Sequence, residues 1–199
     1  MGDIVLSPSY WQVAYSVGAS LSNSWRVDIP IGNGTKTGPQ VDYIRSNYVI
    51  KDRPSVGHYL IATLAIELLP GSVIKQWAEG PDTWPPDGQD PNAPATCGLY
   101  LERKSLDLNK PNHRYWAAGQ HRIVMANGIF TQQIPLTQGN WTHVFGQFEQ
   151  AGFADLLANL GRVGYTFGGG GDYGHGVYLQ NGKCRVSCIR YQFSASPIY

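Results

Sequence analysis

Seven glycines lie within residues 164–176, in the sequence GYTFGGGGDYGHG. The run contains the G-x-G-x-x-G spacing of a dinucleotide-binding loop, which follows a strand and opens a helix whose N-terminus binds the pyrophosphate. Residues 177–182 do not have a helical pattern: they alternate like a strand and end in Asn-Gly, a preferred pair for a two-residue hairpin turn. The glycine run therefore predicts a loop that joins two strands, and it argues against a nucleotide site.

Period-two alternation of apolar residues predicts strands elsewhere in the chain. It is clearest in residues 59–68 and 97–104, where Glu67 and Glu102 fall on faces that we expect to meet solvent. A third segment of this kind runs into Pro135, which ends the strand or places it at the edge of a sheet, because proline lacks a donor for the ladder.

The C-terminal segment changes phase along its length. Cys184 and Cys188 hold one phase, whereas Tyr191 and Phe193 hold the other. Such a change within one strand indicates a β-bulge, which we predict between Cys188 and Ile189.

One short helix is predicted over residues 153–160, from apolar residues at i, i+3, i+4 and i+7 counted from Phe153, with Gly161 as its C-terminal cap. Many short strands, glycine-rich turns and one helix indicate an all-β fold, an antiparallel β-sandwich of the jelly-roll type. We expect a single domain over residues 1–199, with the proline-rich residues 80–95 as a long loop.

The charge of the chain is almost balanced, with 15 Lys and Arg residues against 14 Asp and Glu residues. This balance, without a basic run, argues against a nucleic-acid or anionic-membrane surface. Residues 1–24 lack the basic region and apolar run of a secretion signal, so we expect synthesis in the cytoplasm. No segment has the roughly 18 consecutive apolar residues of a membrane span.

The three cysteines, Cys97, Cys184 and Cys188, are expected to be small buried thiols. Four residues of extended chain separate Cys184 from Cys188 by about 13 Å. A disulfide needs Cα atoms within about 7 Å, so these two residues do not pair within one strand. No Cys-x-x-Cys spacing supports a metal site.

Catalytic patterns are sparse. The chain has no G-x-S-x-G nucleophile elbow, and no spacing brings together the two carboxylates, about 5–10 Å apart, that a glycosidase needs. We therefore predict a non-catalytic protein without a cofactor, and glycoside hydrolase or lyase activity is the less favoured alternative. A Ca²⁺ ion is the alternative for the cofactor, because Asp87, Asp90 and Asn92 offer oxygen ligands within one loop.

Aromatic residues make up 12% of the chain, and their faces stack on sugar rings or anchor protein interfaces. Trp116 and Trp141 lie in strand-like alternation, so we predict that both are buried. Trp84 differs, because its context DTWPPD is not a core sequence. The predicted ligand-binding residues are Trp84 together with three residues of the glycine loop, Asp172, Tyr173 and His175.

Residues 159–177, with NLGRVG followed by YTFGGGGDYGHGV, resemble β-sandwich proteins found among bacterial and phage-encoded accessory proteins, which are similar to jelly-roll carbohydrate-binding modules. The resemblance implies a phage virion accessory component of decoration or tail-tip type. Such a protein would form a homo-oligomer and bind virion proteins or a surface glycan. The alternative is a free-standing carbohydrate-binding module. Unpaired cysteines and the missing secretion signal favour the virion component, whereas aromatic loops favour the sugar-binding module.

Overall fold

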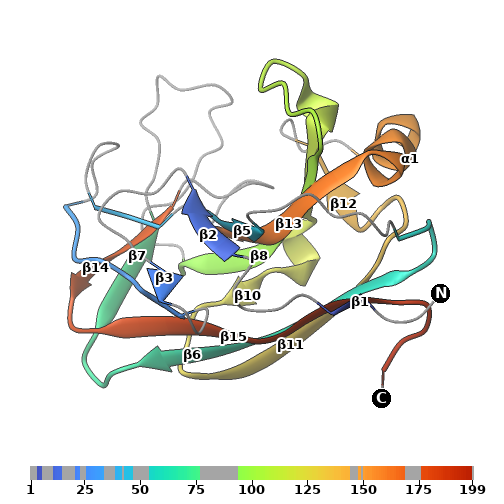
Figure 1. Ribbon diagram of the computed structural model, residues 1–199. Coiled ribbons are helices and arrows are strands. Elements are labelled where there is room, and N and C mark those ends of the chain that lie inside the picture. The colour runs from blue at the N-terminus through green and yellow to red at the C-terminus, as the bar shows by residue number, and fades with distance from the viewer. Residues whose placement is uncertain are drawn as a thin grey trace.

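The computed structural model describes residues 4–5, 11–14, 21–22, 26–33, 39–41, 43–46, 54–76, 94–143, 148, 150–168 and 176–198. Two antiparallel sheets lie face to face, as Figure 1 shows, and a third, small sheet lies at one end. This arrangement confirms the predicted antiparallel β-sandwich.

The first sheet, sheet A, has the order β11-β6-β15-β4-β3, and β1 also pairs with β15. Its strands are β1 (Ile4–Val5), β3 (Leu21–Ser22), β4 (Arg26–Asp28), β6 (Tyr59–Leu68), β11 (Gly128–Pro135) and β15 (Cys184–Ser194).

The second sheet, sheet B, has the order β12-β9-β8-β13-β5-β2, and β10 also pairs with β8. Its strands are β2 (Trp11–Ala14), β5 (Tyr43–Ser46), β8 (Thr96–Arg103), β9 (Arg114–Ala117), β10 (Ile123–Val124), β12 (Trp141–Thr142) and β13 (Leu160–Phe167). Two short 3-10 helices flank β9, at Pro111–His113 and Gly119–His121.

Sheet A follows the sequence patterns closely. Strand β6 has the bounds that alternation predicts, and β11 is an edge strand that ends at Pro135, as expected. In β15, Cys188 pairs with Leu64 and Arg190 pairs with Thr63, so two steps along β15 match one step along β6. This register shift confirms the predicted bulge.

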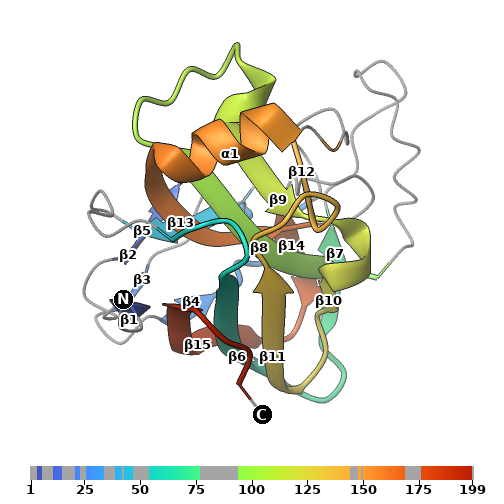
Figure 2. The same cartoon turned by 90° about the vertical axis from the view of Figure 1, so that its right-hand side faces the viewer.

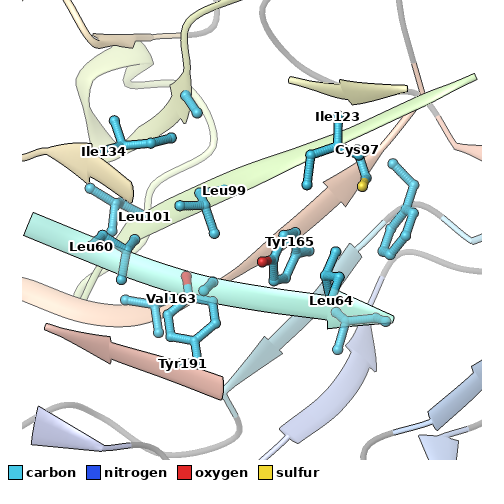
Figure 3. Close-up of a cluster of buried hydrophobic side chains, with 14 of the residues drawn as sticks. Leu60, Leu64, Cys97, Leu99, Leu101, Ile123, Ile134, Val163, Tyr165 and Tyr191 are labelled. Carbon is cyan, nitrogen blue, oxygen red and sulfur yellow. The ribbon is translucent and has the colours of Figure 1, made fainter. Parts of the chain in front are cut away.

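The core lies between the two sheets and draws side chains from both. Figure 3 shows Leu64 of β6, Leu99 of β8, Tyr165 of β13 and Tyr191 of β15 pointing into it. The rings of Tyr165 and Tyr191 meet edge to face with centroids 5.8 Å apart. Burial of these apolar groups is the main stabilising contribution to the sandwich.

Helix α1 (Gln150–Ala158) covers one end of sheet B, where Figures 1 and 2 place it beside β9 and β12. Its Phe153 ring stacks on Trp141 with centroids 6.0 Å apart, which confirms the predicted helix and the burial of Trp141. The predicted cap was wrong: Gly161 lies within β13. A Cβ there would lie 2.4 Å from the Lys104 Cα, so close approach of two strands requires this glycine.

The turn predicted at Asn-Gly is present, with Gly182 at φ +82°, but the predicted hairpin is not. Strand β14 (Val177–Asn181) pairs with β7 (Val73–Gln76) in the small sheet, whereas β15 pairs with β6. The chain also passes from sheet A to the small sheet in the turn between β6 and β7. The Lys183 N–H, in the turn between β14 and β15, donates to Ser72 Oγ in the turn between β6 and β7 at 2.9 Å. The turn residues therefore reverse the chain without pairing the strands on either side.

Candidate functional site

The outer face of sheet B, opposite the core, gathers charged and aromatic side chains. Alternation along β8 points Leu99 and Leu101 to the core and Tyr100 and Glu102 to this outer face. The expectation that Glu102 meets solvent was wrong, because its exposed fraction is 0%. Alternation assigns a residue to a face, but the side chains of neighbouring strands decide whether that face is covered.

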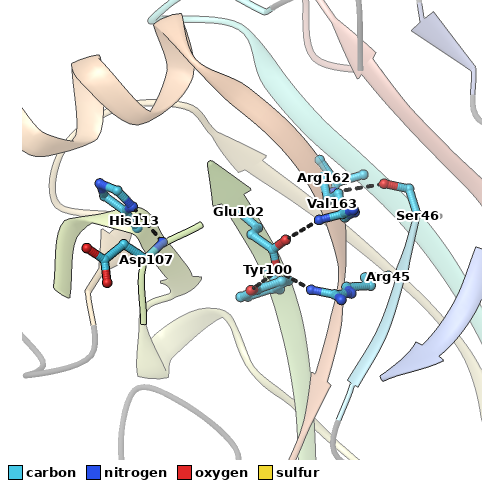
Figure 4. A network of polar contacts seen from close by, with 8 residues as sticks. All are labelled: Arg45, Ser46, Tyr100, Glu102, Asp107, His113, Arg162 and Val163. Atoms are coloured by element: carbon cyan, nitrogen blue, oxygen red, sulfur yellow. Dashed lines mark hydrogen bonds and ion pairs between the residues drawn. The ribbon is translucent and has the colours of Figure 1, made fainter. Parts of the chain in front are cut away.

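Three groups donate hydrogen bonds to the Glu102 carboxylate (Figure 4). Arg45 Nη1 lies 2.6 Å from Oε2, Arg162 Nη1 lies 2.9 Å from Oε1, and the Tyr100 hydroxyl lies 2.6 Å from Oε2. These bonds hold a buried negative charge that would otherwise be strongly unfavourable. Desolvation, followed by the charge of Glu102, raises the pKa of Tyr100 well above its usual value, so its hydroxyl stays protonated as a donor.

Aromatic rings form a layer beside this carboxylate. The rings of Tyr43 and Tyr100 have centroids 5.1 Å apart, and those of Tyr100 and Trp116 are 5.6 Å apart. The Arg114 guanidinium carbon lies 5.4 Å from the Trp116 ring centroid, within cation–π range. The rings are 6%, 1% and 0% exposed, so Trp116 is buried as predicted, although outside the core between the sheets.

Strand register explains why these residues meet. Tyr100 pairs with Trp116, which in turn pairs with Thr142, and Glu102 pairs with both Arg114 and Arg162. Paired residues on neighbouring strands project from the same face of a sheet. We call this surface the arginine face, and its residues are Tyr43, Arg45, Tyr100, Glu102, Arg114, Trp116, Thr142 and Arg162.

The arginine face also holds buried donors without a partner. Among the described residues, Arg114 Nε, Arg162 Nε and Thr142 Oγ1 are buried and make no hydrogen bond. A buried donor without an acceptor costs about 1–3 kcal/mol. The side chains of Arg45 and Arg162 are 15% and 26% exposed, so part of this surface can be reached from solvent.

Two segments with predicted ligand residues, 77–93 and 169–175, are attached to the sandwich next to each other. Strand β7 pairs with β14 where the first segment begins and the second ends. At their other ends, the Gly168 N–H donates to the Thr96 carbonyl at 2.8 Å, and Thr96 Oγ1 donates to the Gly168 carbonyl at 2.7 Å. Both segments therefore leave the same end of the molecule.

Arg122 links this end to sheet B. Its Nε donates to Thr96 Oγ1 at 2.8 Å, and its Nη2 donates to the Gly168 carbonyl. Gly168 and Gly176 have φ angles of +112° and +103°, and the Gly176 N–H donates to the Phe167 carbonyl at 2.8 Å. The strands predicted on either side of the glycine run are present as β13 and β14, whereas residues 169–175 between them lie outside the described residues.

The predicted ligand-binding residues, Trp84, Asp172, Tyr173 and His175, lie outside the described residues, as do the Ca²⁺ candidates Asp87, Asp90 and Asn92. Their roles stay predictions. Sequence reasoning missed the arginines of sheet B, because they come from three strands far apart in the chain. A hint was present in β8, where Tyr100 and Glu102 occupy the positions opposite its apolar phase.

Cys97, Cys184 and Cys188 are free thiols. Cys97 and Cys184 are buried, as expected, whereas Cys188 is partly exposed. Desolvation raises the pKa of each thiol to about 12, which makes them poor nucleophiles. Within the described ranges, no group of three or more His, Cys, Asp or Glu side chains is placed to hold a metal ion. No helix in this part of the chain is long and apolar enough to cross a membrane.

No protein-family model matches the sequence, and a comparison with curated proteins gives no match. Among solved structures, the fold is similar to that of a chain described as "xylan-binding module CBM15". The TM-score is 0.43 and the sequence identity is 10%, over 94% of this chain and 96% of that chain. At this identity no residue of that module can be matched to a position here, so the site is built from the residues described above.

Proposed function

We propose that this protein is a non-catalytic β-sandwich protein that binds a glycan at the arginine face. The observation that supports this function is the set of partly exposed guanidinium groups, those of Arg45 and Arg162, held in place by one buried carboxylate beside a layer of aromatic rings. A glycan presents many oxygen acceptors at close spacing, which the exposed N–H groups of these guanidiniums would bind.

The two neighbouring segments would supply further contacts. Trp84 lies in one of them, and Asp172, Tyr173 and His175 lie in the other. An aromatic side chain from each segment could contact a sugar ring while the carboxylate and imidazole bind hydroxyl groups. Both segments are anchored at the Thr96–Gly168 end of β8 and β13, so we propose that they contact parts of the glycan that extend beyond the arginine face.

The chemistry of the arginine face favours binding over catalysis. Glycoside hydrolysis uses a pair of carboxylic acids, one of which must give or take a proton. Glu102 is the one carboxylate among the described residues of this face, and two guanidiniums and a hydroxyl already bind its oxygens. This group is suited to fixing the arginines in place rather than to exchanging protons with a substrate.

We favour the free-standing carbohydrate-binding module over the virion component, because every residue of the proposed site lies in a single copy of the chain. A role in a virion, with virion proteins as partners in a homo-oligomer, stays a prediction. Light scattering at several protein concentrations tests it: a discrete oligomer would favour the virion setting, and a monomer would favour the free module.

A glycan array followed by calorimetry tests the proposed function. We expect Arg162→Gln to weaken binding of the selected glycan by about tenfold or more, since a hydrogen bond to a charged group contributes about 1.5–3 kcal/mol. Arg185→Gln is the matched control, because Arg185 lies on sheet A and pairs with Asp28 at 2.8 Å. Equal affinity of both variants and the unaltered protein would remove the arginine face from the site.

Trp84→Ala tests the contribution of the proline-rich segment. We expect binding to weaken by about 1–3 kcal/mol, as for an aromatic contact residue, while the unfolding temperature stays the same. Unchanged affinity would exclude Trp84 from the site and leave the arginine face as the binding surface.

A further inference from the structure

We propose that the glycan is acidic and that Arg114 and Arg162 bind its carboxylate or sulfate groups. This inference rests on the proposed function and names the class of ligand for the same site. It follows from the charge of the arginine face, the geometry of its guanidiniums and the burial of its rings.

The arginine face has an excess of positive charge. The chain as a whole is nearly neutral, at +1. Among the described residues of this face, however, three arginines, Arg45, Arg114 and Arg162, surround one carboxylate, that of Glu102. Arg45 and Arg162 share this one carboxylate, and Arg114 makes no ion pair with a described residue. Partly buried charges are weakly screened by salt. A ligand with negative charge complements such a surface.

The guanidiniums have the geometry for a second anion. Arg162 contacts Glu102 through Nη1 and its Nε is buried, but its side chain is 26% exposed, so the far side of the planar group faces solvent. Arg114 also has a buried Nε and is partly exposed, and its guanidinium is held over the Trp116 ring. Carboxylates and sulfates accept two parallel N–H groups from such a planar fork, which makes arginine a better match for them than for single hydroxyls.

The burial of the rings separates this site from one that works by stacking. Tyr43, Tyr100 and Trp116 are at most 6% exposed, so a sugar ring cannot lie on their faces in this conformation. The Trp116 ring instead supports the Arg114 guanidinium, and Arg114 is partly exposed. The arginines are thus the groups that a ligand meets first, which favours an acidic glycan over a neutral one.

The test compares polygalacturonate with its fully methyl-esterified form, which keeps the sugar backbone and removes the charge. Affinity gel electrophoresis and calorimetry are run at about 20 mM and about 300 mM NaCl. We expect the acidic form to bind at least about tenfold more tightly at low salt, and Arg114→Gln and Arg162→Gln each to remove most of this preference. Dextran sulfate and uncharged dextran form a second pair of ligands. Tighter binding of dextran sulfate than of dextran would identify sulfate as a bound group.

The controls separate the possible outcomes. Arg185→Gln should keep the preference, and thermal unfolding should show that every variant is folded. Equal binding of the charged and uncharged forms in both pairs would overturn the acidic ligand while leaving glycan binding intact. Equal loss in Arg185→Gln and Arg162→Gln would indicate general attraction of polyanions and overturn the assigned residues. No binding to any glycan on the array would overturn the proposed function itself.

Discussion

Replacement of Glu102 by Gln tests the organisation of the arginine face most directly. Glutamine has nearly the same shape but no charge, so Arg45 and Arg162 would lose their shared counter-charge while packing is retained. The carboxylate is 0% exposed and accepts hydrogen bonds at 2.6, 2.6 and 2.9 Å, so water cannot replace it without rearrangement. We therefore expect a clear loss of stability.

The magnitude follows from burial. Removal of one member of a fully buried ion pair costs about 3–5 kcal/mol. Arg45 and Arg162 are 15% and 26% exposed, so solvent would partly stabilise their charges and reduce this cost. We expect Glu102→Gln to lower the free energy of unfolding by about 2–4 kcal/mol, which corresponds to a fall in unfolding temperature of roughly 5–15 °C.

Urea unfolding monitored by tryptophan fluorescence measures this change, with Glu67→Gln as the matched control. Glu67 is an exposed carboxylate on β6, and its replacement should change stability by less than about 0.5 kcal/mol. The double variant Glu102→Gln, Arg162→Gln should be more stable than the sum of the two single effects predicts, because it removes one unmatched charge. A Glu102→Gln protein as stable as Glu67→Gln would refute the view that this carboxylate holds the arginines.

Gly164→Ala places a Cβ 2.0 Å from a carbonyl oxygen of β5, so we expect the free energy of unfolding, measured in urea, to fall by more than about 2 kcal/mol. The control Gly119→Ala, whose Cβ meets open space, should lower it by less than about 0.5 kcal/mol. Similar losses in the two variants would contradict the close approach of β13 and β5. Burial lowers the pKa of His113 below 6.5, and its Nδ1 accepts the Asp107 N–H at 3.0 Å. The unfolded chain then binds more protons between the folded pKa and 6.5, so stability should fall as the pH drops through this window and should fall less in His113→Asn. Desolvation raises the pKa of all three thiols to about 12, so the native protein should react slowly with a thiol reagent near neutral pH. Unfolding in guanidinium should make all three thiols reactive. Fast reaction of the folded protein would show that a thiol is accessible.

Local patterns predicted the strands well where the cause of the structure is local. In β6 the phase of Leu60, Ala62, Leu64 and Ile66 is buried throughout, and the bounds of the strand were predicted correctly. The bulge in β15 follows from a change of phase between Cys188 and Ile189, and Pro135 ends β11 because it has no N–H for the ladder. In each case the residues that decide the structure lie within the segment itself.

The candidate site could not be predicted in this way, because its causes are not local. Arg45, Glu102, Arg114 and Arg162 lie on four strands, and only their register brings them together. The same limit explains the wrong cap at Gly161: a glycine after a helical pattern is typical of a C-terminal cap, but here the backbone of the neighbouring strand requires it. Turn residues and glycines indicate local freedom of the backbone, whereas the partner strand is chosen by the whole sheet.

The stability of the arginine face and its proposed ligand are connected, which leads to a last prediction. An acidic ligand that binds only the folded protein raises its stability, by about 2.7 kcal/mol at 100 times the dissociation constant. In Glu102→Gln the ligand would also supply the negative charge that Arg45 and Arg162 have lost. We therefore expect polygalacturonate to raise the unfolding temperature of Glu102→Gln more than that of the unaltered protein or of Glu67→Gln, measured by scanning fluorimetry at low salt. Equal shifts in the three proteins would mean that the ligand's charge does not reach these arginines, even if the protein binds the polymer.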